Sequence, residues 1–253
     1  MRKTCLEEGS PVRAASRDKR RTASLPSAVL FDFNGVLLVD ETCHWLAFRE
    51  VLAPFGVRLG RARYNARYLV FDDRTALRTM LRDARPGTRP PFAELLRRKR
   101  RAYARLARGE RIEPRAARLV KELALLVPVG IVSGAIRAEI VPALRRARLL
   151  RLFRVIVTGE DVRRPKPRPD GYRLALRRLG LKSGRGALAI EDSPGGTRAA
   201  RAAGCEVIGV ATTFRPATLR RAGARVVVRR LATLRPSLVA TTSSRTRPSR
   251  RRS

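Results

Sequence analysis

The sequence predicts an α/β fold, in which a parallel sheet carries helices on both faces and is interrupted by an all-helical insert. Two observations predict it. Short apolar runs rich in β-branched residues alternate with helical patterns between residues 28 and 235. The segment from 41 to 114 breaks this alternation, because its apolar residues recur only at helical spacing. Alternating strands and helices favour a parallel sheet that is covered on both faces.

The expected elements follow in chain order. The strands are expected at residues 28–33, 127–132, 155–158, 187–190, 207–210 and 225–228. The helices between them are expected at residues 115–126, 138–147, 171–179 and 195–203. The resulting domain boundaries are a core of residues 28–40 and 115–235, and a helical insert of residues 41–114.

The insert shows three apolar stripes at helical spacing, around Trp45 and Phe48, around Leu77 and Met80, and around Leu95 and Tyr103. We expect Trp45 and Tyr103 to belong to the core of the insert, and His44, the one histidine, to act as a hinge or insert residue. The basic run at residues 97–101 predicts a solvated helix face, with a nucleic-acid patch or a sensor of substrate charge as its alternatives.

Both ends of the chain, residues 1–27 and 236–253, are basic and are expected to be disordered, because they lack apolar periodicity. No apolar run approaches the roughly 20 residues needed to span a bilayer, and residues 1–27 hold no secretory signal. The three cysteines are widely spaced and form neither a disulfide framework nor a metal-site pattern. We therefore expect a monomeric cytoplasmic protein.

The formal net charge is +36. Arg supplies nearly all of the cations, whereas Lys occurs at only a few positions, which are Lys3, Lys19, Lys99, Lys121, Lys166 and Lys182. Few aromatic residues interleave with these cations. A general compositional bias is thus favoured over a nucleic-acid function, although non-specific polyanion binding is expected at low salt. The charge would also steer an anionic substrate inward.

Four short motifs carry chemistry. Asp32 and Asn34 end the first apolar run and enter a turn at Gly35. Ser133, Gly134 and Ala135 follow the second run. Lys166 lies between two prolines, and Glu191 and Asp192 follow a later run, directly before Ser193. Taken singly, these residues have structural interpretations as a turn acid, helix caps or a solvated charge.

Together, the four motifs suit phosphoryl transfer, which needs a nucleophile, a divalent cation and donors for the phosphate oxygens. Asp32 can supply the nucleophile and form an aspartyl-phosphate. Glu191 and Asp192 offer the oxygen ligands that Mg²⁺ prefers. Ser133 with the amides of Gly134 and Ala135 suits phosphate oxygens, and Lys166 supplies a compact positive charge.

In their order and spacing, these motifs resemble the haloacid dehalogenase-like hydrolase superfamily, and most of all its β-phosphoglucomutase-like phosphatase group. The resemblance covers residues 28 to 235. It implies a Rossmann-like core and that the helical insert is a cap that closes over the site and excludes water. It also implies that Asp32, the backbone carbonyl of Asn34, Glu191 and Asp192 bind Mg²⁺, and that a cap lysine near Lys99 faces the substrate.

One position departs from the pattern of the resembled family. The family has a second aspartate where this chain has Asn34, and that aspartate protonates the leaving oxygen and then activates water. An amide can do neither, and the loss is worth about 10²–10⁴-fold in rate. We therefore expect an Mg²⁺-dependent phosphatase of a small phosphorylated metabolite, with reduced activity. The alternatives are a phosphate-binding protein without useful turnover and a phosphomutase-type variant.

Overall fold

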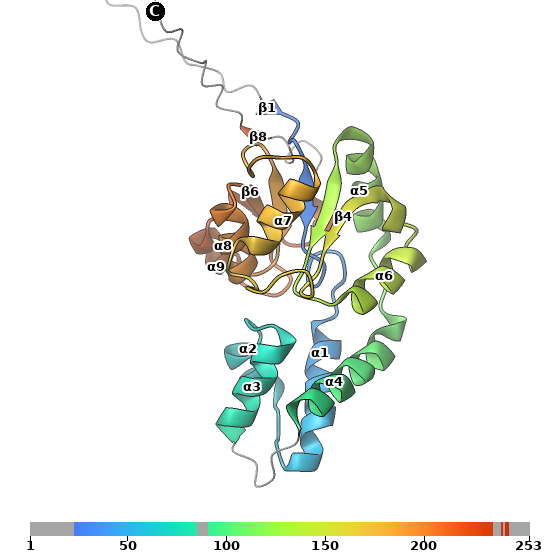
Figure 1. The fold of residues 1–253 in the computed structure, drawn as a ribbon, viewed down its shortest axis with the longest axis vertical. Helices are drawn as coiled ribbons and strands as arrows, with labels where there is room; N and C mark the ends of the chain where they lie inside the picture. The colour runs from blue at the N-terminus through green and yellow to red at the C-terminus, as the bar shows by residue number, and fades with distance from the viewer. Residues whose placement is uncertain (1–22, 85–90, 235–238, 240, 243–253) are drawn as a thin grey trace, which may run out of the picture.

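The computed structural model describes residues 23–84, 91–234, 239, 241 and 242. Its core is a six-stranded parallel sheet with the order β4-β3-β2-β5-β6-β7 (Figure 1). The strands are β2 (Val29–Phe31), β3 (Val129–Val132), β4 (Phe153–Val157), β5 (Leu188–Glu191), β6 (Glu206–Val210) and β7 (Val226–Val228). Each predicted strand is present, and its ends differ from the prediction by at most two residues.

The core helices are α5 (Pro114–Leu126), α6 (Arg137–Arg146), α7 (Asp170–Arg178), α8 (Pro194–Ala202) and α9 (Pro216–Ala222). The first four match the predicted helices to within one residue. Pro stands at the first or second position of α5, α8 and α9, where its missing N–H costs no helical hydrogen bond.

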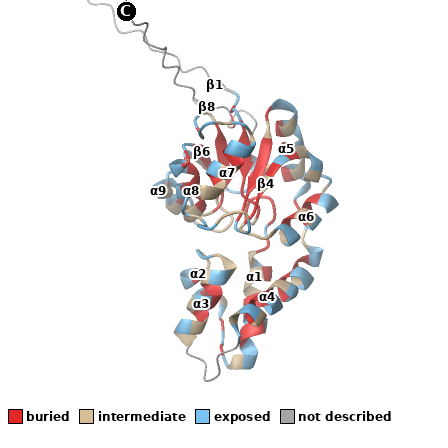
Figure 2. Cartoon of the chain, viewed as in Figure 1, coloured by how far each residue is buried: buried red, intermediate tan, exposed pale blue. Residues whose placement is uncertain are grey.

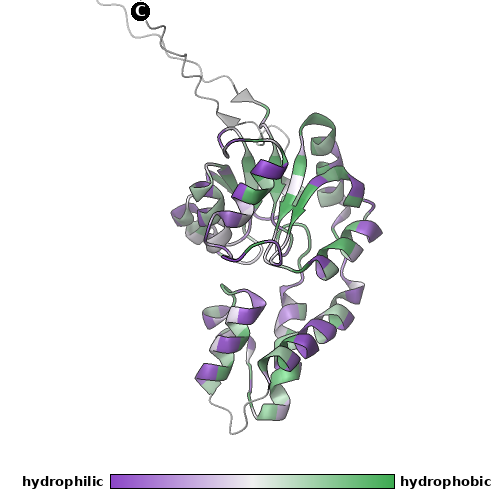
Figure 3. Ribbon diagram, in the orientation of Figure 1, coloured by the Kyte–Doolittle hydropathy of each residue, from purple (hydrophilic) through white to green (hydrophobic). Residues whose placement is uncertain are grey.

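The two faces of the sheet carry separate hydrophobic clusters, and the strands between them are largely buried (Figure 2). In β2, Val29 and Phe31 pack into the cluster that includes residues of α5 and α6, whereas Leu30 packs into the cluster with α7, α8 and α9. Side chains of a strand point alternately to opposite faces, so a central strand must be apolar throughout to cover both. The strands are accordingly the most hydrophobic part of the ribbon, and the helices carry the polar residues (Figure 3).

The insert is helical, as predicted, and lies beyond the carboxyl ends of the strands (Figure 1). It comprises α1 (Glu41–Leu52), η1 (Ala53–Phe55), α2 (Arg61–Arg67), α3 (Asp73–Ala84), α4 (Phe92–Leu106) and η2 (Ala107–Gly109). A third hydrophobic cluster, which includes Phe48, Tyr64 and Leu77, belongs to the insert alone. Trp45 packs against this cluster and Tyr103 lies within it, as expected.

Two features differ from the expectations. The first is Lys99, which is fully buried and not part of a solvated face, whereas Arg97, Arg98 and Arg101 of the same run are exposed. Lys99 shares the buried side of α4 with Leu95, Leu96 and Tyr103, because residues three or four apart lie on one face of a helix.

The second difference concerns the ends of the chain. Ala23–Ser24 (β1) pairs antiparallel with Thr241–Thr242 (β8), although both segments were expected to be disordered. The pairing supplies hydrogen-bond partners for the backbone groups of these four residues, which an expectation based on composition does not take into account. For residues 1–22, 236–238, 240 and 243–253 this expectation lies outside the described residues, as does Cys5.

Within the described residues, Cys43 and Cys205 are free and buried. None of the described helices has the length and apolar character that a membrane span requires.

Candidate active site

The predicted site residues follow four different strands of the sheet. Asp32 comes directly after β2 and Ser133 directly after β3. Lys166 lies in the connection that follows β4, and Glu191 is the last residue of β5. Because the strands are parallel, their carboxyl ends meet at one edge of the sheet, which faces the helical insert (Figure 1). Ligands of open α/β sheets bind at this edge.

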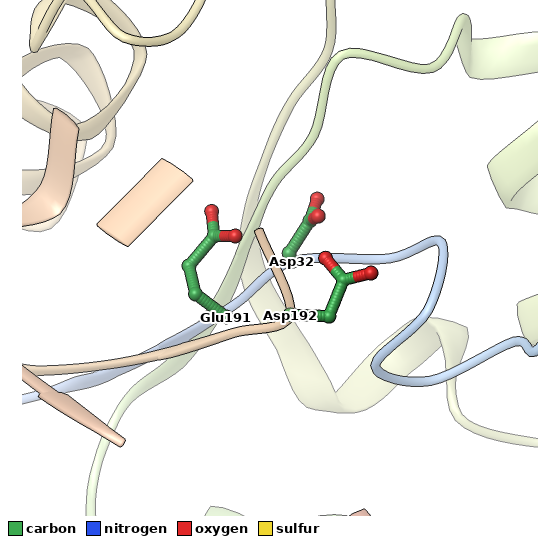
Figure 4. Close-up of side chains that lie close together, drawn as sticks. All are labelled: Asp32, Glu191 and Asp192. Carbon is green, nitrogen blue, oxygen red and sulfur yellow. The ribbon is translucent and has the colours of Figure 1, made fainter. Parts of the chain in front are cut away.

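Three carboxylates gather at this edge. Oxygens of Asp32, Glu191 and Asp192 lie within 4.8 Å of one another, and their side chains converge from two neighbouring strands (Figure 4). All three residues are buried, with exposed fractions of 8%, 0% and 5%. Three carboxylates at such short separations repel one another unless a cation lies among them.

Lys166 supplies part of the missing positive charge. Its Nζ lies 2.6 Å from Oε1 of Glu191 and 3.1 Å from Oδ1 of Asp32. It also donates a hydrogen bond of 2.8 Å to the carbonyl of Val132 in β3. Burial disfavours the ammonium, but the two carboxylates outweigh it and raise the pKa of Lys166. Lys166 is therefore a fixed positive charge beside Asp32 near neutral pH.

The two neighbouring acids differ in how many donors hold them. Oε1 of Glu191 accepts hydrogen bonds from Lys166 and from the hydroxyl of Tyr172 at 2.7 Å, and Oε2 accepts one from Ser193 at 3.2 Å. Asp192 is hydrogen-bonded by the hydroxyl of Thr213. Asp192 consequently has more lone pairs free for a metal ion.

Two glycines make room for these acids. Gly35 has φ +74°, and a Cβ there would lie 1.9 Å from Oδ2 of Asp192. A Cβ at Gly196, in α8, would lie 2.0 Å from Oε1 of Glu191. Any side chain at either position would displace a carboxylate, so both glycines are part of how the site is built.

The electrostatics of the cluster fit a divalent cation. Burial raises the pKa of Asp192 well above its ordinary value, and the negative charges of Asp32 and Glu191 raise it further. The pKa of Glu191 is raised for the same main reason, burial, against the opposing effect of Lys166. A cluster of oxygen ligands that is short of positive charge suits Mg²⁺, which takes carboxylate and carbonyl oxygens.

Ser133 begins the turn expected to bind phosphate. Its amide donates to the carbonyl of Val157, and its hydroxyl accepts a hydrogen bond of 3.1 Å from the amide of Ala135. The carbonyl of Ala135 in turn accepts from the amide of Gly159. Ser133 is buried and Gly134 is exposed, so the turn opens to solvent at Gly134.

The side chain of Asn34 bonds to a residue at the start of the cap. Its Nδ2 donates a hydrogen bond of 2.7 Å to Oδ2 of Asp40 and lies 3.3 Å from Nε2 of His44. Oδ2 of Asp40 also accepts a short hydrogen bond from the hydroxyl of Tyr103. These donors, with His44, hold the pKa of Asp40 below its ordinary value in spite of burial, which opposes the shift.

The buried cluster continues into the cap. Nζ of Lys99 reaches both oxygens of Asp73, at 2.6 and 2.5 Å, and lies 2.7 Å from Nδ1 of His44. Burial and the charge of Lys99 oppose protonation of His44, but the carboxylates of Asp40 and Asp73 outweigh both and raise its pKa to about 10. The imidazole is therefore charged near neutral pH and lies between two carboxylates, with Nε2 3.6 Å from Oδ2 of Asp40 and Nδ1 3.6 Å from Oδ1 of Asp73. His44 lies in α1 of the helical insert, and its hinge or cap role stays a prediction.

Sequence reasoning missed Tyr172, Thr213 and Asp40 as parts of the site. Tyr172 and Thr213 follow no recognisable motif, and they reach the acids only because the fold brings distant segments together. One feature of the sequence could have drawn attention to Asp40, which is an acid eight positions after Asp32 at the expected start of the insert. Nothing in the sequence indicated that it is the partner of Asn34. The burial of Lys99 could have been inferred from its spacing to Leu95 and Tyr103.

The fold and this constellation define a class of enzyme. A carboxylate beside a fixed ammonium, an acidic pair fit for a divalent cation and a serine turn at the carboxyl edge of a parallel sheet are the parts that a phosphatase-type hydrolase uses.

Comparison with known proteins agrees with this class. The sequence model of the family described as haloacid dehalogenase-like hydrolase matches residues 29–210. Protein CbbY of Cereibacter sphaeroides is 35% identical over 190 residues, which are 72% of this chain and 82% of that protein. The phosphorylated carbohydrates phosphatase of Thermotoga maritima is 27% identical over 186 residues, which cover 72% of this chain and 83% of that protein.

A solved structure shows the same fold. A mutant of CbbY from Rhodobacter sphaeroides, in complex with xylulose-(1,5)-bisphosphate, superposes with a TM-score of 0.74 at 30% identity, over 83% of this chain and 96% of that one. The chain belongs to the haloacid dehalogenase-like hydrolase family.

Proposed function

We propose that this protein is an Mg²⁺-dependent phosphatase of a small phosphorylated metabolite, which transfers the phosphoryl group first to Asp32 and then to water. The observation that carries the proposal is the meeting of the Asp32, Glu191 and Asp192 oxygens within 4.8 Å, with Nζ of Lys166 3.1 Å from Asp32. The named relatives that act on phosphorylated carbohydrates support a sugar phosphate as the substrate class.

Each residue has a separate task in this proposal. Asp32 is the nucleophile, and the fixed charge of Lys166 offsets negative charge on the phosphoryl oxygens. Ser133, Gly134 and Ala135 orient those oxygens through hydroxyl and backbone donors. Asp32, Glu191, Asp192 and the backbone carbonyl of Asn34 would hold Mg²⁺, which supplies charge neutralisation during the transfer. The free thiols of Cys43 and Cys205 are compatible with a cytoplasmic location.

Asn34 limits the range of substrates. With no acid at this position, the leaving oxygen must depart without a proton from residue 34. We therefore expect the best substrates to have leaving groups of low basicity, such as an anomeric or an acyl oxygen. The same residue disfavours mutase chemistry, which needs an acid and a base in both of its halves.

The test is phosphate release from a panel of phosphorylated metabolites, with and without Mg²⁺, by the wild type and by Asp32→Asn. Release that depends on the metal and is lost in Asp32→Asn is the expected result. The alternative function, a phosphate-ligand-binding protein, is favoured by Asn34. It predicts no release from any member of the panel, together with binding that isothermal calorimetry detects.

A further inference from the structure

The second chemical step needs a group that removes a proton from water. In the first step, an oxygen of Asp32 forms a bond to phosphorus and the bond from phosphorus to the leaving oxygen breaks. In the second step, a water oxygen bonds to phosphorus, the bond to Asp32 breaks, and the water loses a proton. Among the described residues, the groups to consider for that proton are Asn34, Asp40, His44, Lys166, Glu191 and Asp192, and Asp192 would be engaged by Mg²⁺ in the proposed site.

Asn34 is the first group to consider, since its side chain lies two residues after the nucleophile. Its amide nitrogen donates to Oδ2 of Asp40 at 2.7 Å. This bond fixes which end of the amide faces the cap, because a carboxylate accepts and an amide oxygen cannot donate. The amide has no proton to exchange near neutral pH, so Asn34 can position a water molecule but cannot activate it.

Asp40 cannot act as the base in place of Asn34. The side chain of Asp40 is fully buried, and Oδ2 already accepts hydrogen bonds from Asn34 and Tyr103. Oδ1 of Asp40 has no hydrogen-bond partner among the described residues, but this oxygen is buried as well, so bulk water does not reach it.

His44 and Lys166 are excluded by their own partners. His44 stacks on Tyr103 with ring centroids 4.2 Å apart, and both of its ring nitrogens face other side chains, Nδ1 those of Lys99 and Asp73 and Nε2 those of Asp40 and Asn34. No lone pair of the ring is left for water. Lys166 keeps its proton because it pairs with Glu191 and Asp32, and Glu191 is occupied by Lys166, Tyr172 and Ser193.

From these contacts we propose that the phosphoryl group, once transferred to Asp32, stays there, so that the protein accumulates as a phosphoaspartate form and releases phosphate only slowly. The proposal rests on the proposed function, because it uses the same nucleophile. Donors that need no proton on the leaving oxygen, such as acyl phosphates, would load the site readily. The protein would then act as a phosphoryl acceptor and store, with hydrolysis as its slow step.

The test uses the full chain with Mg²⁺ and acetyl phosphate, whose leaving group is a carboxylate. After an acid quench, intact-protein mass spectrometry detects the added phosphoryl group, and peptide mapping locates it. We expect labelling of the wild type at Asp32 and none in Asp32→Asn. After removal of the donor, the label should last about 10²–10⁴-fold longer in the wild type than in Asn34→Asp. Asn65→Asp makes the same chemical change on the exposed face of α2 and should keep the wild-type lifetime.

A second measurement needs no variant at residue 34. With p-nitrophenyl phosphate, the wild type should release one equivalent of nitrophenol per site in a rapid burst, followed by a slow steady phase. Linear release without a burst or a label would overturn the proposal and leave the phosphatase function standing. Equal label lifetimes in the wild type and Asn34→Asp would also overturn it. Neither label nor release from either donor would overturn both.

Discussion

Nδ2 of Asn34 lies 2.7 Å from Oδ2 of Asp40, and this hydrogen bond joins the carboxyl edge of the core sheet to the start of the helical insert. Asp40 is the residue directly before α1, and Tyr103 of α4 donates to the same oxygen. An amide therefore has a structural role at position 34, because a carboxylate there would face another carboxylate at hydrogen-bond distance.

The first prediction concerns the pH dependence of stability in Asn34→Asp. The negative charge of Asp40 should raise the pKa of the new carboxyl above about 3.9, its value in the unfolded chain. The folded variant then binds this proton more tightly than the unfolded one, so its free energy of unfolding should fall as the pH rises from about 4 through the raised pKa. Urea unfolding across this range measures the effect. The exposed Asn65→Asp variant should show no such fall, and a flat profile in Asn34→Asp would contradict the prediction.

The second prediction compares two glycines with nearly the same backbone conformation. Gly35 and Gly56 have φ of +74° and +73°, but a Cβ at Gly56 would meet no atom within 4 Å. Gly56→Ala should therefore lose only about 1–2 kcal/mol of stability, which is the cost of holding a non-glycine residue in the left-handed conformation. Gly35→Ala should lose more, together with Mg²⁺ binding, because its Cβ would displace Asp192. Calorimetric titration with Mg²⁺ separates the two variants, and intact binding in Gly35→Ala would show that the carboxylate can move aside.

A third prediction distinguishes the two acids of the metal site. Asp192→Asn should weaken Mg²⁺ binding more than Glu191→Gln does, because three donors already engage Glu191. Mg²⁺ should raise the melting temperature of the wild type, since a ligand that binds only the folded state stabilises it. The rise should be smallest in Asp192→Asn. A larger effect in Glu191→Gln would mean that Glu191 gives up its present partners when the metal binds.

The fourth prediction tests the buried ion pair of the cap. Asp73→Asn leaves the fully buried ammonium of Lys99 without a carboxylate, so it should cost about 3–5 kcal/mol. Glu94→Gln breaks ion pairs with Arg97 and Arg98 on the outer side of the same helix, where the cost should be about 1 kcal/mol or less. Urea unfolding of both variants checks the contrast. Comparable losses would show that solvent reaches Lys99.

The ion pair of Asp73 and Lys99 should also make the free energy of unfolding depend on pH. Burial opposes ionisation of Asp73, but Lys99 and His44 outweigh it and lower the pKa of this carboxyl. A lowered pKa contributes stability that is present above about pH 4, the unfolded value, and is lost as the pH falls further. Asp73→Asn should therefore lose less stability between about pH 4 and about pH 2 than the wild type does.

The sequence was sufficient to predict the fold and to identify the candidate site residues at the ends of the strands. Apolar runs located all six core strands, and Asp32, Ser133, Lys166, Glu191 and Asp192 could be recognised because each stands in a short local motif. Their chemical roles in the reaction remain predictions.

The contacts that control these residues could not be predicted. Asp40 and Tyr103 are 63 positions apart, and only the packing of α1 against α4 brings them together. The 97–101 run misled for a different reason, since five consecutive basic residues suggest a single exposed face, whereas a helix turns one of every three or four residues inward. Asn34 was recognised as unusual, but its partner depends on that same helix packing.

The pairing of Ala23–Ser24 with Thr241–Thr242 has a practical consequence. These strands lie at the end of the core opposite to the cap, well away from the edge that holds Asp32 (Figure 1). An affinity tag, a fluorophore or an immobilising tether joined beyond either strand would therefore leave the mouth of the site and the path of the cap unobstructed. Surface-attached protein would be suitable for single-molecule recordings that test whether the helical insert moves relative to the core.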